Sequence, residues 1–125
     1  PGLVHYDIGD CLRSCCNPLG EETLQVELVT FDLNLCRAIL EGYLMMGRSF
    51  LSDQDFRYLP DCIRLIPFEL GLRFLTDYLD GDRYFRTDRT SHNLDRALVQ
   101  FALTQSIEAQ EDDLQLMIRE LSGAS

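Results

Sequence analysis

The chain has 125 residues, of which 46% are hydrophobic and 26% charged, and its formal net charge is −10. This length and apolar content suit one globular domain and exclude an intrinsically disordered chain. The acidic balance argues against nucleic acid or an anionic membrane as a partner, because both need clustered Lys and Arg, and no apolar stretch approaches the ~20 residues of a membrane span.

The first quarter of the chain predicts one helix and one strand. Residues 1–4 have the composition of a connection, since Pro-Gly favours a turn. Residues 5–16 predict a short helix with Ile8 and Leu12 on its inner face. Residues 24–30 alternate apolar and polar side chains, which predicts a short strand.

Capping residues mark the next helices. Asp32 predicts the start of a helix over 33–47. Ser52, with Asp55 three residues later, predicts a second helix start that resembles a capping box. Pro60 suits the first turn of a separate helix, where its missing N–H costs nothing.

A long helix is predicted over 61–79, and it is apolar on two broad faces. Such a helix is normally buried between neighbours. Gly71 would allow one neighbour to approach closely. One stripe consists of Leu65, Phe68, Leu72, Leu75 and Leu79, and the other of Cys62, Ile63, Ile66, Leu70, Phe74 and Tyr78.

The remaining sequence predicts a loop and one last helix. Residues 82–91 are rich in Arg and Asp, and Ser91 is placed as the N-cap of a helix over 93–121 that ends at Gly123. The prediction is therefore an all-α fold of about five helices in a single domain, 1–125.

Glu69, Arg73 and Asp77 are the most informative charged residues. They are four apart, so on a helix they share one face. Charges on an otherwise buried helix must pair or open onto a cleft. Arg73 has five fixed donors, which suit sugar hydroxyls or an anion; the alternative is an ion pair with Glu69 or Asp77.

The cysteines predict no metal site. Five cysteines, an odd number without a C-x-x-C pair or a secretion signal, fit reduced thiols and a cytoplasmic location. A zinc site from His5, Cys11, Cys15 and Cys16 is conceivable, but structural zinc sites have tighter, repeated ligand spacing. Buried thiols are the favoured interpretation.

Phosphate-binding chemistry is missing from the chain. All 11 basic residues are Arg, and there is neither a Lys nor a glycine-rich loop for nucleotide phosphates. If this protein takes part in phosphoryl transfer, other residues must hold the phosphates.

Four sequence runs together resemble a known enzyme family. They are Asp7-Ile-Gly-Asp-Cys-Leu-Arg13, Glu41-Gly-Tyr43, Arg73-Phe-Leu-Thr-Asp-Tyr-Leu-Asp-Gly-Asp-Arg-Tyr-Phe85 and His92-Asn-Leu-Asp-Arg-Ala97. In this order they resemble the C-terminal part of the phosphotransferase enzyme family, which has the aminoglycoside-phosphotransferase, protein-kinase-like fold. Within that family, they are most similar to the N-acetylhexosamine 1-kinases.

The resemblance implies a two-lobed enzyme that uses ATP and magnesium to phosphorylate a hydroxyl of a sugar. The family's catalytic loop, metal-binding Asp and nucleotide lobe have no counterpart in this sequence. The chain is therefore expected to be a fragment without catalytic residues, which binds neither ATP nor metal alone and contributes recognition of the acceptor.

The resemblance also assigns roles to particular residues. Arg73 and Tyr84 match family positions that contact the sugar. Asp77 is predicted to belong to the same substrate-binding site, where its place one turn from Arg73 would let it orient that side chain. A packed loop aromatic is the alternative role for Tyr84. Asp7, Asp10, Arg13 and Glu69 would support the site structurally, with Arg13 as the partner of an Asp.

A second function is compatible with the same sequence. The chain could be a stand-alone acidic helical domain that binds a protein partner, or a second copy of itself, through an exposed apolar surface.

Overall fold

The computed structural model describes residues 4–47 and 52–123, so the turn predicted at Pro1 and Gly2 lies outside it. Within the described residues the chain forms five α-helices and one short 3₁₀ turn, which confirms the all-α prediction with about five helices. The elements are α1 (Val4–Cys15), η1 (Val26–Leu28), α2 (Leu33–Gly47), α3 (Asp53–Leu79), α4 (His92–Ala109) and α5 (Glu111–Ser122).

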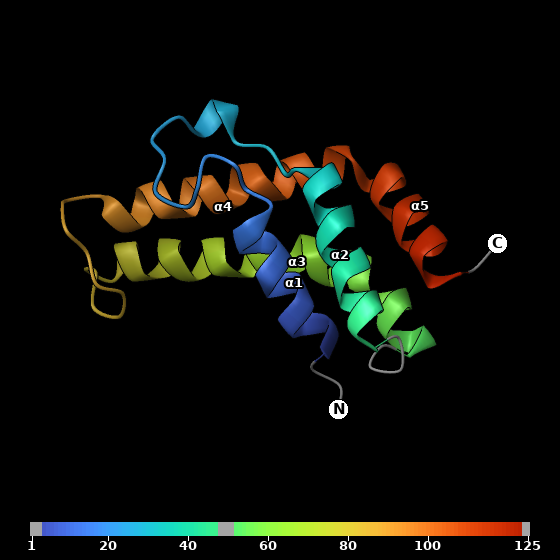
Figure 1. Cartoon of the computed structure of the whole chain (residues 1–125). Coiled ribbons are helices and arrows are strands. Elements are labelled where there is room, and N and C mark those ends of the chain that lie inside the picture. The colour runs from blue at the N-terminus through green and yellow to red at the C-terminus, as the bar shows by residue number, and fades with distance from the viewer. Residues whose placement is uncertain (1–3, 48–51, 124–125) are drawn as a thin grey trace.

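Two long helices form the frame of the fold. α3 and α4 run antiparallel side by side, and the loop 80–91 joins them at one end (Figure 1). α1 packs on α3 and α2, and α5 packs on α3 and α2 at the other end. The core between them includes Leu12, Leu59, Ile63, Leu103, Ile107 and Leu114, all at most 2% exposed.

The predicted caps of α2 and α3 are confirmed. The carboxylate of Asp32 accepts a hydrogen bond from the Leu35 N–H at 2.9 Å. At the start of α3, the Asp55 N–H donates to Ser52 Oγ at 3.2 Å and the Ser52 N–H donates to the Asp55 carboxylate at 2.9 Å. These bonds satisfy backbone donors that the first turn of a helix leaves unpaired.

The predicted boundary at Pro60 is wrong, because α3 runs unbroken through Pro60 and Pro67. An interior proline costs about 3 kcal/mol through its lost hydrogen bond and steric clash. Leu59 and Ile63 are only 1% and 0% exposed on either side of Pro60. Burying such side chains stabilises by about 1.5–3 kcal/mol each, which is enough to offset the proline.

The last helix is divided, contrary to prediction. α4 ends and α5 begins around Gln110, whose φ of −110° departs from helical geometry. The side-chain amide of Gln110 donates to the Phe31 carbonyl at 2.9 Å and to the Ser106 carbonyl at 3.2 Å. These bonds connect the turn between α4 and α5 to the end of the loop 17–31. Ser91 does precede α4, but with φ 65° and without a capping bond from its side chain.

The predicted strand at 24–30 is also wrong. This segment contains the turn η1 instead, in which the Leu28 and Val29 N–H groups donate to the carbonyls of Gln25 and Val26. No strand occurs in residues 4–47 and 52–123. A lone extended segment without a partner leaves its backbone groups unpaired, so the segment satisfies them locally.

Only one of the two apolar stripes of α3 is buried. Ile63, Ile66 and Phe74 lie in the core. The stripe through Leu65, Phe68, Leu72 and Leu79 is between 42% and 76% exposed, contrary to the expectation that both faces would be covered.

Gly71 separates these two stripes and meets α4. A Cβ at this position would lie 2.6 Å from the Phe101 ring, so the predicted close approach is confirmed. Phe101 also packs on Phe68, with ring centroids 6.0 Å apart.

Candidate functional site

The loop 80–91 is built on the carboxylate of Asp77. After α3 ends, the N–H groups of Arg83, Tyr84 and Phe85 donate to the two Asp77 oxygens at 2.9, 2.7 and 2.9 Å. Asn93 of α4 adds a fourth donor at 2.8 Å. Burial opposes ionisation of Asp77, but the backbone donors and Asn93 outweigh it and lower the pKa of this carboxyl.

A turn with left-handed backbone allows this wrapping. Gly81 has φ 93° and Asp82 has φ 59°, so the chain reverses directly beyond α3. The Asp82 carboxylate accepts a second bond from the buried Asn93 amide at 3.1 Å. The loop is therefore anchored to the ends of both long helices.

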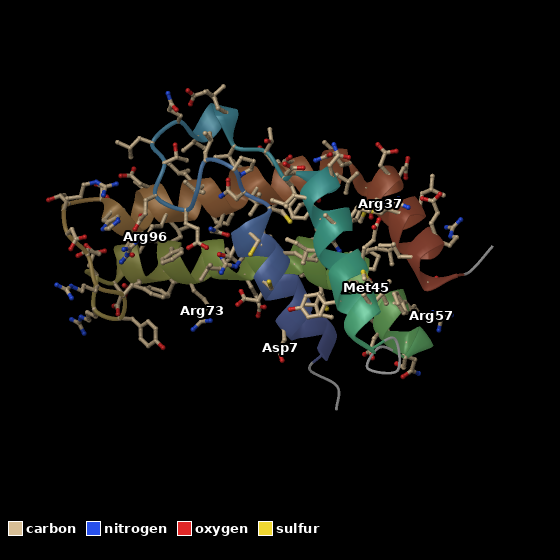
Figure 2. The ribbon with its side chains drawn as sticks, viewed as in Figure 1. Asp7, Arg37, Met45, Arg57, Arg73 and Arg96 are labelled. Carbon is tan, nitrogen blue, oxygen red and sulfur yellow. The ribbon has the colours of Figure 1, made fainter. Side chains whose placement is uncertain are left out.

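Arg96 connects the loop 80–91 and α4 to the loop 17–31, which contains Glu22. Its guanidinium donates to the Arg86 carbonyl at 2.8 Å and the Asn93 side-chain oxygen at 3.0 Å, and it forms an ion pair with Glu22 at 3.3 Å. It also lies 5.6 Å from the ring of Phe74. In Figure 2, Arg96 lies at the end of the bundle where loop 80–91 meets α4.

His92 has a structural position. The residue is 3% exposed, and its ring Nδ1 accepts the Asp88 N–H at 3.1 Å. Nε2 therefore carries the proton and donates to Glu22 at 2.9 Å. Desolvation raises the pKa of Glu22, but the bonds from His92 and Arg96 prevail, so the net shift is downward.

A surface pocket of about 420 Å³ opens beside this anchored loop. Arg73 is exposed on its wall, and Figure 2 shows its side chain projecting outward from α3. Tyr84, 75% exposed, stacks edge-on against Phe85 with centroids 4.9 Å apart, and Phe85 packs on Phe74 at 4.5 Å. The lining residues are Leu72, Arg73, Thr76, Asp77, Asp80, Tyr84 and Phe85.

The structure thus brings Arg73, Tyr84 and Asp77 to one pocket, but it gives Asp77 different partners from those expected. Among the described residues, no hydrogen bond or ion pair joins Arg73 to Glu69 or Asp77. Arg73 therefore lines the pocket without a hydrogen bond or ion pair to any described residue. Glu69 is exposed one turn away and does not line it.

The predicted supporting residues on α1 lie elsewhere. Arg13 donates to Asp10 at 2.9 Å, as expected, and also to Glu21 at 2.6 Å. Desolvation lowers the pKa of Arg13, but the two carboxylates outweigh it and the net shift is upward. Together they fix the start of the loop 17–31, whereas Asp7 is exposed. None of these side chains lines the pocket.

Sequence reasoning missed Glu22, Asn93 and Arg96 as organisers of the site. Asn93 and Arg96 belong to a run quoted for the family resemblance, so the sequence pointed to these residues, but it assigned no role to either. Glu22 carried no signal, because only the folded loop brings it to α4.

A larger hollow of about 750 Å³ lies between the start of α3 and α5. Arg57 and Arg119 line it, but none of the candidate site residues predicted from the sequence does. Volume alone does not identify a site, since functional pockets combine shape with convergent polar groups. The pocket at Arg73 and Tyr84 is therefore the better candidate.

No protein-family model matches the chain. In the part of the chain that the structure describes, no three His, Cys, Asp or Glu side chains converge as metal ligands. Likewise, none of the helices in 4–47 and 52–123 has the length and apolar character to cross a bilayer.

Proposed function

We propose that this chain is the acceptor-binding helical part of a cytoplasmic, ATP-dependent sugar phosphotransferase, with an N-acetylhexosamine as the preferred acceptor. The observation that carries the proposal is that Arg73, which has no hydrogen bond or ion pair among the described residues, lines the same pocket as Tyr84 and Phe85. An Arg fork binds vicinal oxygens, and an aromatic face stacks on a sugar ring. The exposed Asp80 carboxylate can accept bonds from further hydroxyls.

The remaining residues of the site act as its support. Asp77 fixes the backbone on both sides of Tyr84 and so holds that residue at the pocket that Arg73 also lines. ATP and magnesium would be held by another part of the enzyme, since this chain has no Lys and no glycine-rich loop. The proposal therefore predicts binding of the acceptor without turnover; ATP-dependent phosphorylation of a sugar by these residues alone would contradict it.

An NMR titration tests the acceptor site. When N-acetylglucosamine is added to the ¹⁵N-labelled chain, we expect shifts of the amides in 72–85, with a Kd on the order of 1 mM. Arg73→Ala should weaken binding at least about tenfold, because it removes charge-assisted hydrogen bonds. Arg119→Ala is the matched control on α5. Unchanged spectra, or equal binding by Arg73→Ala, would rule out this site.

One observation favours the alternative function, a self-associating interaction domain. The outer stripe of α3 (Leu65, Phe68, Leu72 and Leu79) and Leu98 of α4 are each at least 42% exposed. The three- and four-residue spacing is that of a helix-packing seam. Phe68 and Leu98 also line an apolar groove of about 350 Å³ between the helices.

The occupant of this face would be a second copy of the chain. Glu69 and Arg73 border the stripe one turn apart, and neither has a hydrogen bond or ion pair within the described residues. A two-fold axis that sets two α3 helices antiparallel brings Glu69 of each copy opposite Arg73 of the other. In this arrangement the charges that border the face are complementary between the two copies.

Mixing two variants tests this alternative. By sedimentation velocity, we expect a dimer of the unmodified chain and monomers of Glu69→Arg and of Arg73→Glu, whose like charges would oppose each other. An equimolar mixture of the two variants should restore a dimer, because the exchanged charges then pair. Met45→Ser, at an 89% exposed site on α2, is the control. A monomeric unmodified chain, or no restoration on mixing, would exclude the dimer.

A further inference from the structure

Two cysteine side chains meet on the surface of α1. The sulfurs of Cys11 and Cys15 are 3.8 Å apart, one helical turn from each other. Cys15 is exposed and Cys11 is partly covered, whereas Cys16 and Cys36 are buried. A reagent in solution can therefore reach Cys15 directly and has a second thiol within contact distance.

A bond between these two sulfurs requires the helical turn to open. Residues four apart on an α-helix have Cα atoms about 6.2 Å apart, within the roughly 4.4–6.8 Å range of disulfides, but their Cβ atoms are about 5–6 Å apart and a disulfide needs roughly 3.5–4.5 Å. The bond therefore forms only when the backbone of the turn 11–15 locally unwinds. Such a bond is strained, and strained, exposed disulfides are the readily reduced ones.

We propose that Cys11 and Cys15 form a reversible thiol modification site, at which a low-molecular-weight disulfide such as oxidised glutathione thiolates Cys15 and Cys11 then resolves the adduct. In the first step the Cys15 thiolate attacks the reagent, forms a mixed disulfide and releases one glutathione thiolate. In the second step the Cys11 thiolate attacks Cys15 Sγ and displaces the second glutathione. The protein loses two electrons and two protons, and one glutathione disulfide becomes two thiols.

The surroundings set the rate of this exchange. The hydrogen bond with Cys11 is the first cause that raises the pKa of Cys15, followed by the charge on Cys11, burial and Cys16. Tyr43 of α2 bonds to Cys11, and Asp7 lies near Tyr43; neither residue is cationic. Since the thiolate is the attacking species, the first step is slow at neutral pH and the second is accelerated by proximity.

The oxidised state has a structural consequence in the same helical turn. Arg13 lies between the two cysteines and holds Asp10 and Glu21. When the turn 11–15 unwinds, Arg13 is displaced from Asp10 and Glu21, which loosens the loop 17–31. We expect the melting temperature of the oxidised chain to fall by a few degrees and to recover fully when a dithiol reductant is added.

Intact-mass spectrometry of the full chain with oxidised glutathione tests the proposal. The unmodified chain should become lighter by two hydrogen atoms and retain no glutathione. Cys11→Ser should stop at one glutathione adduct on Cys15, and Cys15→Ser should react at least about tenfold more slowly. Trypsin cuts after Arg13 and Arg37, so a non-reducing digest should yield the peptides 1–13 and 14–37 still linked. Because 14–37 also contains Cys16 and Cys36, fragmentation of the linked pair by tandem mass spectrometry should place the bond at Cys15.

Cys62→Ser serves as the control, because this partly buried thiol is on α3 and outside the pair. It should behave like the unmodified chain. A stable glutathione adduct on the unmodified chain, a Cys11→Ser variant that acquires no adduct, or a link involving Cys36 would each overturn the proposal. None of these outcomes depends on sugar binding, so the test is independent of the proposed function.

Discussion

Replacement of Asp77 by Ala is expected to lower the melting temperature of the chain by about 10 °C. The substitution removes the acceptor of three backbone N–H groups and of the Asn93 amide, all at 2.7–2.9 Å. These donors are partly or fully buried. Water does not fully replace the charged acceptor that such donors lose. Thermal unfolding followed by circular dichroism measures the effect.

Asp77→Asn tests the contribution of the negative charge, because Asn has nearly the same shape as Asp. The amide keeps one acceptor oxygen, but its NH₂ group then faces the donors that met the second oxygen. We therefore expect nearly the same loss as in Asp77→Ala. Asp80→Ala, on an exposed side chain one turn away, is the matched control and should change the melting temperature by no more than about 2 °C. A loss equal to that of Asp80→Ala would contradict the anchoring role.

The same carboxylate predicts a pH dependence. Because the pKa of Asp77 is lowered in the folded chain, its contribution to stability is complete above the ordinary aspartate value of about 4. That contribution is lost as the pH falls from there through the lowered folded-state value. The difference in melting temperature between the unmodified chain and Asp77→Asn should therefore narrow below pH ~4, and a constant difference would exclude this linkage.

Local signals in the sequence were sufficient for the starts of α2 and α3. Asp32 and Ser52 cap those helices because a cap needs only residues within one turn. The helix breaks were not predictable in the same way. Whether α3 continues through Pro60 depends on the core around Leu59 and Ile63, and the break at Gln110 depends on a bond to Phe31, far away in the chain.

The candidate site shows the same division. Spacing on one helix placed Arg73 and Asp77 on a shared face, and both do reach one pocket. The partners of Asp77 could not be predicted, because they are backbone donors of a loop whose path depends on positive φ at Gly81 and Asp82. Sequence patterns identify side chains, whereas the bonds of an irregular loop emerge only from its fold.

Arg96→Met is expected to destabilise the chain by about 2 kcal/mol, measured by chemical denaturation. The guanidinium is 17% exposed and bonds to the Arg86 carbonyl, Asn93 and Glu22. Methionine retains the apolar length of the side chain, so the loss reports mainly on these polar bonds. Removing the cation also leaves Glu22 with His92 as its remaining partner.

The positions at which Arg96→Met speeds amide exchange show whether Arg96 holds the loop 80–91 in place or is an ordinary surface residue. Because Arg96 connects the loop 80–91 to α4, the variant should show faster amide hydrogen exchange at Tyr84 and Phe85. The exchange rates of amides in the core of α3 should change only as much as the free energy of global unfolding does. Arg89→Met is the control, since Arg89 makes a half-exposed ion pair with Asp95 and exposed pairs contribute about 0–1 kcal/mol. If the two variants lose equal stability, the network at Arg96 does not hold the site together, and the placement of Tyr84 must then depend on Asp77 alone.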